Sequence, residues 1–454
     1  MVCLAGTKIK GEAPMKSAWD RIRSSTKASA IIFGLLFAAW LVPPVVHDLR
    51  HLCPVRPDGV NQAEAVPAFA RKYGISCSQC HSAYPTLNAY GRLFKLNGYV
   101  RSKGGDEGVM VTPDGALHID KLFPWGVIVR SRPWDYSNTD NNNGKIQGIH
   151  ELDLFIASGD VAKNVSVFTE VDSNADSNFT TSAGDLQAGY HPYKFLNFLV
   201  ARRGFFVMDP YQTLSNFGSP TVANRAIAGG QNDQGSLSGD TLDETKQTVA
   251  AYGQVGQEKL GSVYYALGAS ADKGDDAGKG PKDGNIRLAF STPKDNFMIG
   301  TFGSTGKEGP SVTPGGTNVQ FSKTGVDTMA EFFGFTARGA FLYAFDKDLD
   351  AVAAGIQPDF ERNRAAYVEL MYIYTRGDSD TPFLVPLLRQ NWYQTANGTR
   401  EFAYLTAQLA HYFSPNVKAF VEFSADTKQD VTSADLTTRQ PKCSRITLQA
   451  ELGF

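Results

Sequence analysis

From about Leu117 to the end of the chain, apolar side chains recur at every second position in a series of runs. In one run, Val368 and Leu370 stand on one face and Glu369 on the other. A period of two is the repeat of a β-strand, and one apolar face per strand is typical of a barrel with lipid outside and water or a plug inside. Runs of this kind include residues 151–156, 366–374 and 417–425.

The links between these runs alternate strictly between short and long. We expect short turns at residues 159–164, 191–194, 256–261, 293–296, 337–339 and 414–416. We expect longer polar connections at residues 131–145, 208–244, 272–283, 306–317, 347–363 and 427–442. This pattern predicts an all-β domain, a barrel of about 16 strands with both of its ends on the periplasmic side.

The last strand carries the strongest barrel signal. Its apolar positions alternate with polar ones up to a terminal aromatic residue: Ile446, Leu448, Ala450, Leu452 and Phe454. Such an ending resembles that of bacterial outer-membrane barrels. A soluble β-sandwich also alternates and is the competing fold, but it rarely combines so many strands with this asymmetry of loops.

The first 65 residues predict an export signal rather than folded structure. Positive residues precede a charge-free stretch at 28–46, and an A-x-A cleavage pattern follows at Ala63-Glu64-Ala65. Translation starting at Met15 would make the positive region more ordinary. The alternative is an uncleaved helical anchor, since the apolar stretch is just long enough to span a membrane. Beyond Ala65 no comparable stretch occurs, so a membrane-bound mature protein must cross as strands.

Composition narrows the class of function further. The 454 residues carry 44 Lys and Arg against 46 Asp and Glu, a net charge of −2, which gives no footing for nucleic-acid binding. The content of Gly (44), Phe (29) and Tyr (18) suits a barrel with many turns and aromatic interfaces.

Residues 66–115 form a short, mainly helical segment between the signal and the barrel at 116–454. It contains Cys77-Ser78-Gln79-Cys80-His81, the C-x-x-C-H attachment motif of a c-type haem. Cys77 and Cys80 would form the thioethers, and His81 would bind the iron axially. A redox dithiol would need a βαβ setting, and a zinc site would need a second pair of ligands. The sequence around the motif predicts no βαβ unit. The other cysteines, Cys3, Cys53 and Cys443, offer no second pair of zinc ligands at comparable spacing.

Other residues are weaker candidates for chemistry. Met110 or His118 is a candidate distal haem ligand. Cations that could pair with haem propionates are Arg71, Lys72, Arg92 and Lys95, with solvated surface charge as the alternative. Alternation directs His150 toward the lipid interface, and a short turn at His191 and another near His411 predict that both lie at the periplasmic rim.

Acidic clusters in the expected outer loops could bind Fe(II) or Ca(II), although loop carboxylates are usually only solvated. The clusters are Asp233, Asp240, Asp243 and Glu244; Asp272, Asp275 and Asp276; and Asp346, Asp348 and Asp350. The chain contains no D-x-D-x-D-G calcium loop.

The residues from Pro67 to Tyr99 resemble the fused monohaem cytochrome–porins of bacterial outer membranes, whose best-studied members are ferrous-iron oxidases. The match follows P-x-F-A-R-x-x-G-x-x-C-x-x-C-H-x-x-x-P-x-L-x-x-x-G-x-x-F-x-x-x-G-Y. The resemblance implies an oxidoreductase with one covalent haem c, extracellular Fe(II) as electron donor and a periplasmic c-type cytochrome as acceptor. We expect the haem segment to plug the lumen from the periplasmic end. Two alternatives are an outward electron conduit to an extracellular acceptor and a solute porin with a cytochrome plug.

Overall fold

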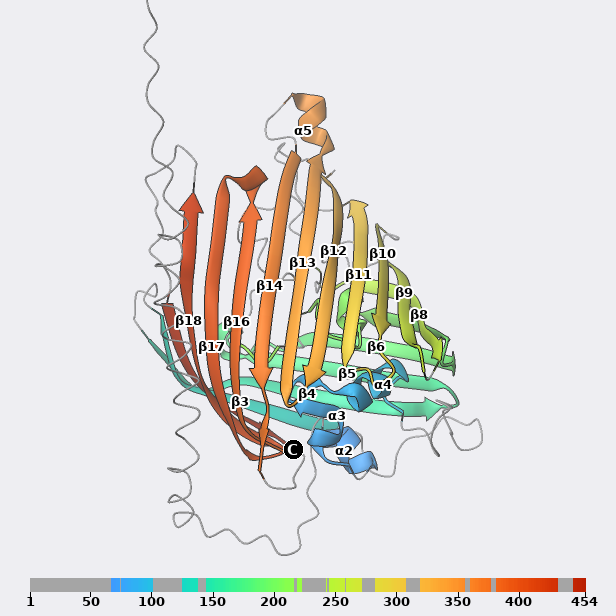
Figure 1. The fold of residues 1–454 in the computed structure, drawn as a ribbon, viewed down its shortest axis with the longest axis vertical. Helices are drawn as coiled ribbons and strands as arrows, with labels where there is room; N and C mark the ends of the chain where they lie inside the picture. Colours follow the sequence, from blue (N-terminus) through green and yellow to red (C-terminus); the bar gives the residue numbers. More distant parts are fainter. Residues whose placement is uncertain are drawn as a thin grey trace, which may run out of the picture. The chain divides into compact units, whose positions relative to one another are not determined.

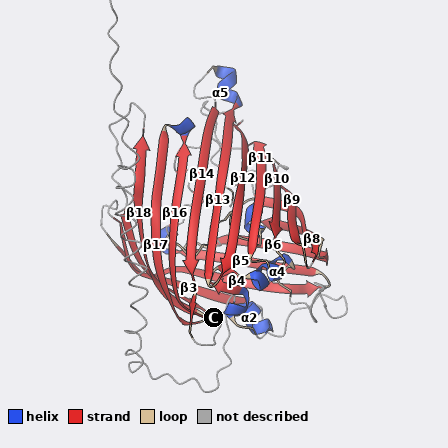
Figure 2. Cartoon of the chain, viewed as in Figure 1, coloured by secondary structure: helices blue, strands red, loops and turns tan. Residues whose placement is uncertain are grey.

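The computed structural model describes residues 67–73, 75–100, 125–137, 144–215, 219–222, 242, 245–257, 259–271, 282–307, 319–355, 360–376, 381–431 and 444–454. All of them belong to one compact unit that spans residues 62–454. Strands dominate, and helices are few and short (Figure 2). Among the described residues no helix is long and apolar enough to cross a membrane.

The sheet is a closed barrel of antiparallel strands. Its long strands are β3 (Trp125–Ser137), β4 (Lys145–Ala162), β5 (Val165–Asn174), β6 (Ser182–Tyr193), β7 (Leu196–Arg202), β8 (Gln247–Gln257), β9 (Gly261–Ser270), β10 (Asp283–Ser291), β11 (Phe297–Lys307), β12 (Val319–Phe332), β13 (Phe335–Asp348), β14 (Phe360–Tyr372), β16 (Pro382–Thr395), β17 (Arg400–Ser414), β18 (Val417–Val431) and β19 (Ser444–Gly453). The two-residue β15 (Tyr374–Thr375) also pairs with β16, but β14 pairs with β16 directly. The barrel therefore has sixteen long strands. The prediction of a 16-stranded barrel is confirmed, and the β-sandwich alternative is wrong.

The barrel is apolar outside and polar inside. On β14, Val368 is 66% exposed on the outer face, whereas the inward-facing Glu369 is 1% exposed and paired with Arg338 and Arg389. The last strand follows the expected alternation, with exposed Ile446, Leu448, Leu452 and Phe454. Because strands of a membrane barrel turn apolar side chains outward and polar ones inward, this is the polarity of a barrel built for lipid.

The two ends of the barrel differ. At the short-turn end, β3 and the chain terminus meet through paired hydrogen bonds between Val127 and Phe454. The opposite end carries the short helix α5 (Leu349–Ala354), and Figure 1 shows it far from the end where the terminus and α2 to α4 lie. Two connections at this opposite end are short, η2 (Ala175–Ser177) and η6 (Ala396–Gly398), so the expected strict alternation is wrong there.

Two expected links also lie elsewhere. No turn occurs at residues 337–339, because β13 runs through them and the inward Arg338 binds Glu369; the turn is at Phe333 and Gly334. The connection expected from residue 131 begins only after Ser137, where β3 ends.

The prediction that His150 faces lipid is wrong. His150 is buried, whereas Leu152 and Leu154 are exposed. The pairing of β3 with β4 shifts from Arg130↔Glu151 to Arg132↔Gln147, so four steps along β4 match two along β3. This bulge breaks the alternation between Gln147 and Glu151 and turns His150 inward.

Three short helices and a small hairpin precede the barrel: α2 (Pro67–Tyr73), α3 (Cys77–Cys80), β1 (His81–Ala83), β2 (Thr86–Leu87) and α4 (Ala89–Leu96). Asn88 caps α4 by accepting a hydrogen bond from the backbone of Gly91 at 2.9 Å. We refer to residues 67–100 as the N-terminal segment. Its helices lie beside the short-turn end of the barrel (Figure 1).

Candidate functional site

The C-x-x-C-H motif lies on a single helical turn. Cys77 and Cys80 begin and end α3, and His81 follows as its C-cap. The Cys77 thiol is buried and the Cys80 thiol is half-buried. Burial raises the pKa of the Cys80 thiol to about 12, so this sulfur is protonated at neutral pH.

The imidazole of His81 is held in the orientation that a metal ligand requires. Its Nδ1 donates a hydrogen bond to the backbone carbonyl of Pro85 at 3.1 Å, so Nε2 is the ring nitrogen that could bind a metal. Burial lowers the pKa of His81 to about 4, so the ring is neutral at physiological pH. A neutral imidazole whose second nitrogen is fixed by a carbonyl is the usual arrangement of a metal-binding histidine.

A cavity of 520 Å³ adjoins the motif. It is lined by Cys77, Cys80 and His81, and by aromatic rings from the N-terminal segment and from two barrel strands: Phe69, Phe94, Tyr99, Phe155 and Phe168. Its volume falls within the range of about 300–1,000 Å³ that is usual for ligand and cofactor sites. The lining residues therefore suit a porphyrin, because they combine two sulfurs and an imidazole with several aromatic rings.

The aromatic rings link the N-terminal segment to the barrel wall. Phe69 stacks on Tyr99 with 5.1 Å between ring centroids, and Tyr99 stacks on Phe168 of β5 at 5.4 Å. The hydroxyl of Tyr73 donates to the carbonyl of Tyr99 at 3.1 Å. The apolar wall of the cavity is thus shared between the N-terminal segment and the barrel.

The barrel contributes charged residues to the cavity wall. Arg130 pairs with Glu151 at 2.8 Å and also with Asp153, and Lys418 pairs with Glu451 at 3.0 Å. Other polar side chains that line the cavity are Arg132, Glu170, Arg203 and Gln449. Sequence reasoning missed these cations, because they lie on strands that only the closed barrel brings to the motif.

The described part of the connection between β7 and β8 lies against inward-facing barrel residues and lines the cavity. Gln212 accepts a hydrogen bond from the backbone of Leu87 at 3.3 Å, and residues 219–222 also line the cavity. Barrel residues fix this part of the connection: Ser219 donates to Glu369 at 2.8 Å, and Gln408 donates to the carbonyl of Pro220 at 2.8 Å. The sequence predicted that residues 208–244 form an external polar loop, and this prediction is wrong for the residues of the connection that the structure describes.

The inward connection contains several large apolar residues. Within it, η3 (Phe205–Met208) is followed by Tyr211 and Leu214, and Phe205, Phe206, Tyr211 and Leu214 are buried. A water-exposed loop gains nothing from such residues, so this apolar run is the signal that identifies the inward fold.

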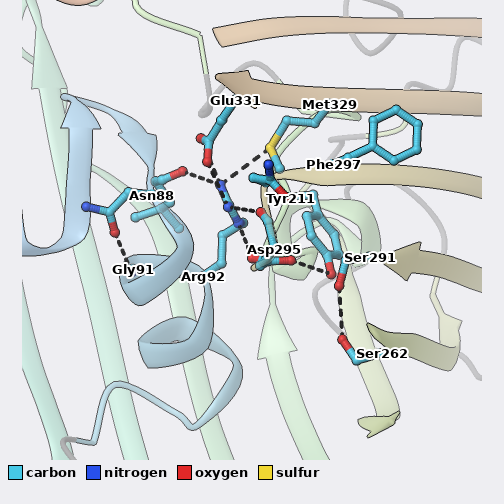
Figure 3. Close-up of polar contacts among 12 residues, drawn as sticks. Asn88, Gly91, Arg92, Tyr211, Ser262, Ser291, Asp295, Phe297, Met329 and Glu331 are labelled. Carbon is cyan, nitrogen blue, oxygen red and sulfur yellow. Dashed lines mark hydrogen bonds and ion pairs between the residues drawn. The ribbon is translucent and has the colours of Figure 1, made fainter. Parts of the chain in front are cut away.

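Arg92 of α4 fixes the N-terminal segment to the barrel. Its guanidinium donates from Nε to Asp295 at 2.6 Å and forms two hydrogen bonds of 3.0 Å to Glu331 (Figure 3). It also donates to the backbone carbonyls of Leu87 at 2.8 Å and Asp295 at 2.6 Å. Asp295 lies on the turn between β10 and β11, and Glu331 near the end of β12.

Two of the four cations proposed for propionates have other partners. Arg92 does not line the cavity beside the motif, and its donors are bound to the barrel. Lys95 lines that cavity, but its ammonium donates to the carbonyls of Val207 at 2.7 Å and Asp209 at 3.0 Å. Both residues connect α4 to the barrel, Arg92 from outside the cavity, and the propionate role of Lys95 stays a prediction. Lys72 lies 5.4 Å from the Tyr73 ring, and the side chain of Arg71 is outside the described residues.

The remaining candidates divide by position. Met110 and His118 lie outside the described residues, so the distal ligand stays a prediction. His191 is buried near the end of β6, bound to Ser166 at 2.8 Å and Asn197 at 3.2 Å. His411 of β17 lies between the rings of Phe383 and Phe413, at 4.8 and 4.6 Å.

Of the acidic clusters, only Asp346, Asp348 and Asp350 are described. Asp348 caps α5 by accepting hydrogen bonds from the backbone of Asp350 and Ala351. Within the described ranges, no three His, Cys, Asp or Glu residues are grouped as a metal site would require. The clusters at 233–244 and 272–276 are outside those ranges.

Comparison with known proteins shows the fold. No family model and no curated protein matches the chain. An anion-selective porin from Comamonas acidovorans is 10% identical, over 73% of this chain and 98% of its own, with a TM-score of 0.50. OmpF of Salmonella typhi in complex with daunomycin is also 10% identical, over 73% of this chain and 97% of its own, with a TM-score of 0.51. The chain therefore has the barrel fold of outer-membrane porins.

Proposed function

We propose that this protein is an outer-membrane electron-transfer protein that holds one c-type haem at Cys77, Cys80 and His81. The observation that carries the proposal is the His81 ring, fixed through Nδ1 to the Pro85 carbonyl beside a cavity lined by both cysteines. When bound, a haem would supply a centre that takes up and releases one electron at a time. The resemblance to cytochrome–porins supports extracellular Fe(II) as donor and a periplasmic cytochrome as acceptor.

The chain's residues would perform three tasks at this site. The two thiols would anchor the porphyrin covalently, and the neutral His81 would provide an axial nitrogen. The rings of Phe69, Phe94 and Phe168 would exclude water from its faces. The barrel cations that line the cavity, Arg132 among them, would balance the propionate charges.

The proposal orients the barrel with its short turns in the periplasm, as is usual for bacterial barrels. The N-terminal segment would then occupy the periplasmic end of the lumen. Its Tyr84 carbonyl accepts hydrogen bonds from Tyr412 at 3.2 Å and Lys418 at 3.0 Å, and Arg92 binds the wall near β10 to β12. Donor electrons would arrive from the loop side, past the inward connection that includes Gln212.

Stopped-flow absorbance after Fe(II) is added to the oxidised, detergent-solubilised protein tests this function. We expect reduced-haem bands to appear rapidly, with a rate that saturates in Fe(II). Reduction by dithionite but not by Fe(II) would contradict the oxidase function and favour the outward conduit, which would use the same residues in the opposite direction.

A solute porin with a haem plug is the second candidate, favoured by the likeness to an anion-selective porin. The two differ in conductance. Because the N-terminal segment and the inward connection both bind residues of the lumen wall, we expect the electron-transfer protein to conduct ions poorly in planar bilayers. Large, stable conductance that is independent of haem redox state would favour the porin.

A further inference from the structure

A second cavity, of 660 Å³, lies on the other side of α4. Gly91, Phe94 and Lys95 line the cavity beside the C-x-x-C-H motif, whereas Tyr90 and Leu93 line the second one. At 3.6 residues per turn Leu93, with Arg92 and Leu96 of the same cavity, lies on the face opposite Gly91 and Lys95, and Tyr90 lies at the border of the two faces. A single helix about 10–12 Å thick therefore separates the two cavities.

Exposed lysines lie on the short turns at the same end of the barrel as this second cavity. Four consecutive short turns, from the β4–β5 turn to the β10–β11 turn, each carry one exposed lysine: Lys163, Lys194, Lys259 and Lys294. Lys194 and Lys294 line the cavity itself. Among the described side chains of these turns the only carboxylate is Asp295, and Arg92 binds it. The rim is therefore positively charged.

The centre of the same surface is apolar. Leu93 is 41% exposed, although it lies on a helix whose opposite face is buried. Its neighbour Tyr90 stacks on Phe94 with 6.3 Å between centroids and an angle of 11° between planes, and Phe94 lines the first cavity. We call Tyr90 and Leu93, together with Lys194, Lys259 and Lys294, the α4 surface.

We propose that the α4 surface is the docking site for a soluble electron carrier with an acidic face around its exposed redox centre. This inference rests on the proposed function. An apolar centre with a charged rim favours fast, specific and short-lived association with a partner of opposite charge. One electron passes to the carrier, whose metal centre is reduced as the haem iron is oxidised, with no proton or bond changed.

Anionic lipid headgroups are the competing ligand of such lysines. Headgroups would bind the lysines, but an apolar helix face that lines the same cavity as Lys194 and Lys294 would add nothing to that binding. The exposed Leu93 and the stacked Tyr90–Phe94 pair, which leads toward the first cavity, therefore favour a protein partner.

Binding of an acidic soluble monohaem cytochrome c to the full-length haem-loaded protein in zwitterionic-lipid nanodiscs tests this surface. We expect salt-sensitive binding, weakened about tenfold at low ionic strength by Lys294→Glu and severalfold by Leu93→Ser. A basic cytochrome c should not bind. The matched control is Arg376→Glu, since Arg376 is exposed on the β14–β16 link at the same end but does not line the second cavity.

Equal weakening by Lys294→Glu and Arg376→Glu would overturn the proposal, as would binding that needs anionic lipid in the nanodiscs or that is indifferent to Leu93→Ser. Fe(II) reduction of the haem in the same preparations reports separately on the proposed function. If Fe(II) fails to reduce the haem while the acidic cytochrome still binds, the proposed Fe(II) oxidation is contradicted and the docking site is not.

Discussion

At the scale of single residues, the side chains around the motif are fixed by partners distant in sequence. His81 is oriented by a carbonyl only four residues away, but the hairpin that supplies this carbonyl is itself bound by Lys418 of β18. The motif residues could therefore be identified from the sequence, whereas the groups that hold them in place could not. Those groups come from strands that meet only when the barrel closes.

Arg92→Gln should loosen the N-terminal segment. The substitution removes the guanidinium that binds Asp295 and Glu331, and leaves two carboxylates facing an uncharged amide. We expect the free energy that holds the N-terminal segment to the barrel to fall by roughly 2–3 kcal/mol. Breaking a fully buried ion pair costs ~3–5 kcal/mol, and the cost here is smaller because both carboxylates are partly exposed. Limited proteolysis of the folded barrel should show faster cleavage within residues 67–100.

Arg376→Gln is the control for this experiment, because Arg376 is an exposed arginine at the same end of the barrel. Cleavage at the same rate in both variants and in the wild type would contradict a docking role for Arg92.

The buried Lys95 should make the stability of the N-terminal segment depend on pH. Burial, and next the charge of Arg203, lower the pKa of Lys95 from 10.5 to about 7. Between these values the unfolded segment binds a proton there that the folded segment does not, so the free energy of unfolding of the segment rises with pH. The slope is at most about 1.4 kcal/mol per pH unit. Hydrogen exchange of α4 amides, corrected for intrinsic rates, should show increasing protection from pH 7 to 10.

Lys95→Met should abolish this slope, since methionine does not titrate. The exposed Lys163, changed to Met, should leave the slope as it is. A slope that persists in Lys95→Met would assign the pH dependence to another group.

At the scale of elements, α4 packs directly against the turn that carries the cysteines. A Cβ on Gly91 would lie 2.0 Å from the backbone oxygen of Cys80, which already accepts a hydrogen bond from Asn88 at 3.0 Å. Only a glycine permits this approach. The position of α4 against α3 thus depends on one missing side chain.

Gly91→Ala should therefore separate α4 from the motif. We expect a cost of about 1–3 kcal/mol, as for an overpacked core, and severalfold less covalently bound haem per chain. Gly148→Ala is the control, because no atom lies within 4 Å of a Cβ built on Gly148. Haem incorporation unchanged by Gly91→Ala, measured by in-gel haem staining, would be inconsistent with this packing.

The strands were predictable from the sequence because each one has one face in contact with lipid. Alternation failed where the backbone departs from a regular ladder, as at the bulge that buries His150. It also failed to identify the turn at Phe333 and Gly334, because this turn is flanked by aromatic rather than polar residues. The small residues of 337–339 suggested a turn, whereas Arg338 is held within the sheet by Glu369.

The cavity was beyond sequence reasoning for a different reason. Its wall combines the N-terminal segment, the first barrel strands, the last strands and an inward connection, and no local pattern relates Phe69 to Phe168 or Gln212 to Leu87. These contacts depend on the closed barrel, which brings together residues about a hundred positions apart or more.

At the scale of the whole molecule, a porin-like barrel encloses the C-x-x-C-H motif near its short-turn end. The barrel supplies charged residues of the cavity wall, the N-terminal segment supplies the thiols and the imidazole, and the inward connection lines the same cavity. The proposed electron transfer requires a haem at this position, so covalent attachment of haem is its central claim.

Mass spectrometry of the mature protein, produced in cells that attach c-type haem, tests that claim most directly. We expect one haem per chain, covalently bound to the peptide that contains Cys77 to His81 and absent from the Cys77→Ser/Cys80→Ser variant, with Ser78→Ala as a control that keeps it. A mature, folded barrel in which this peptide carries two unmodified thiols would contradict the account.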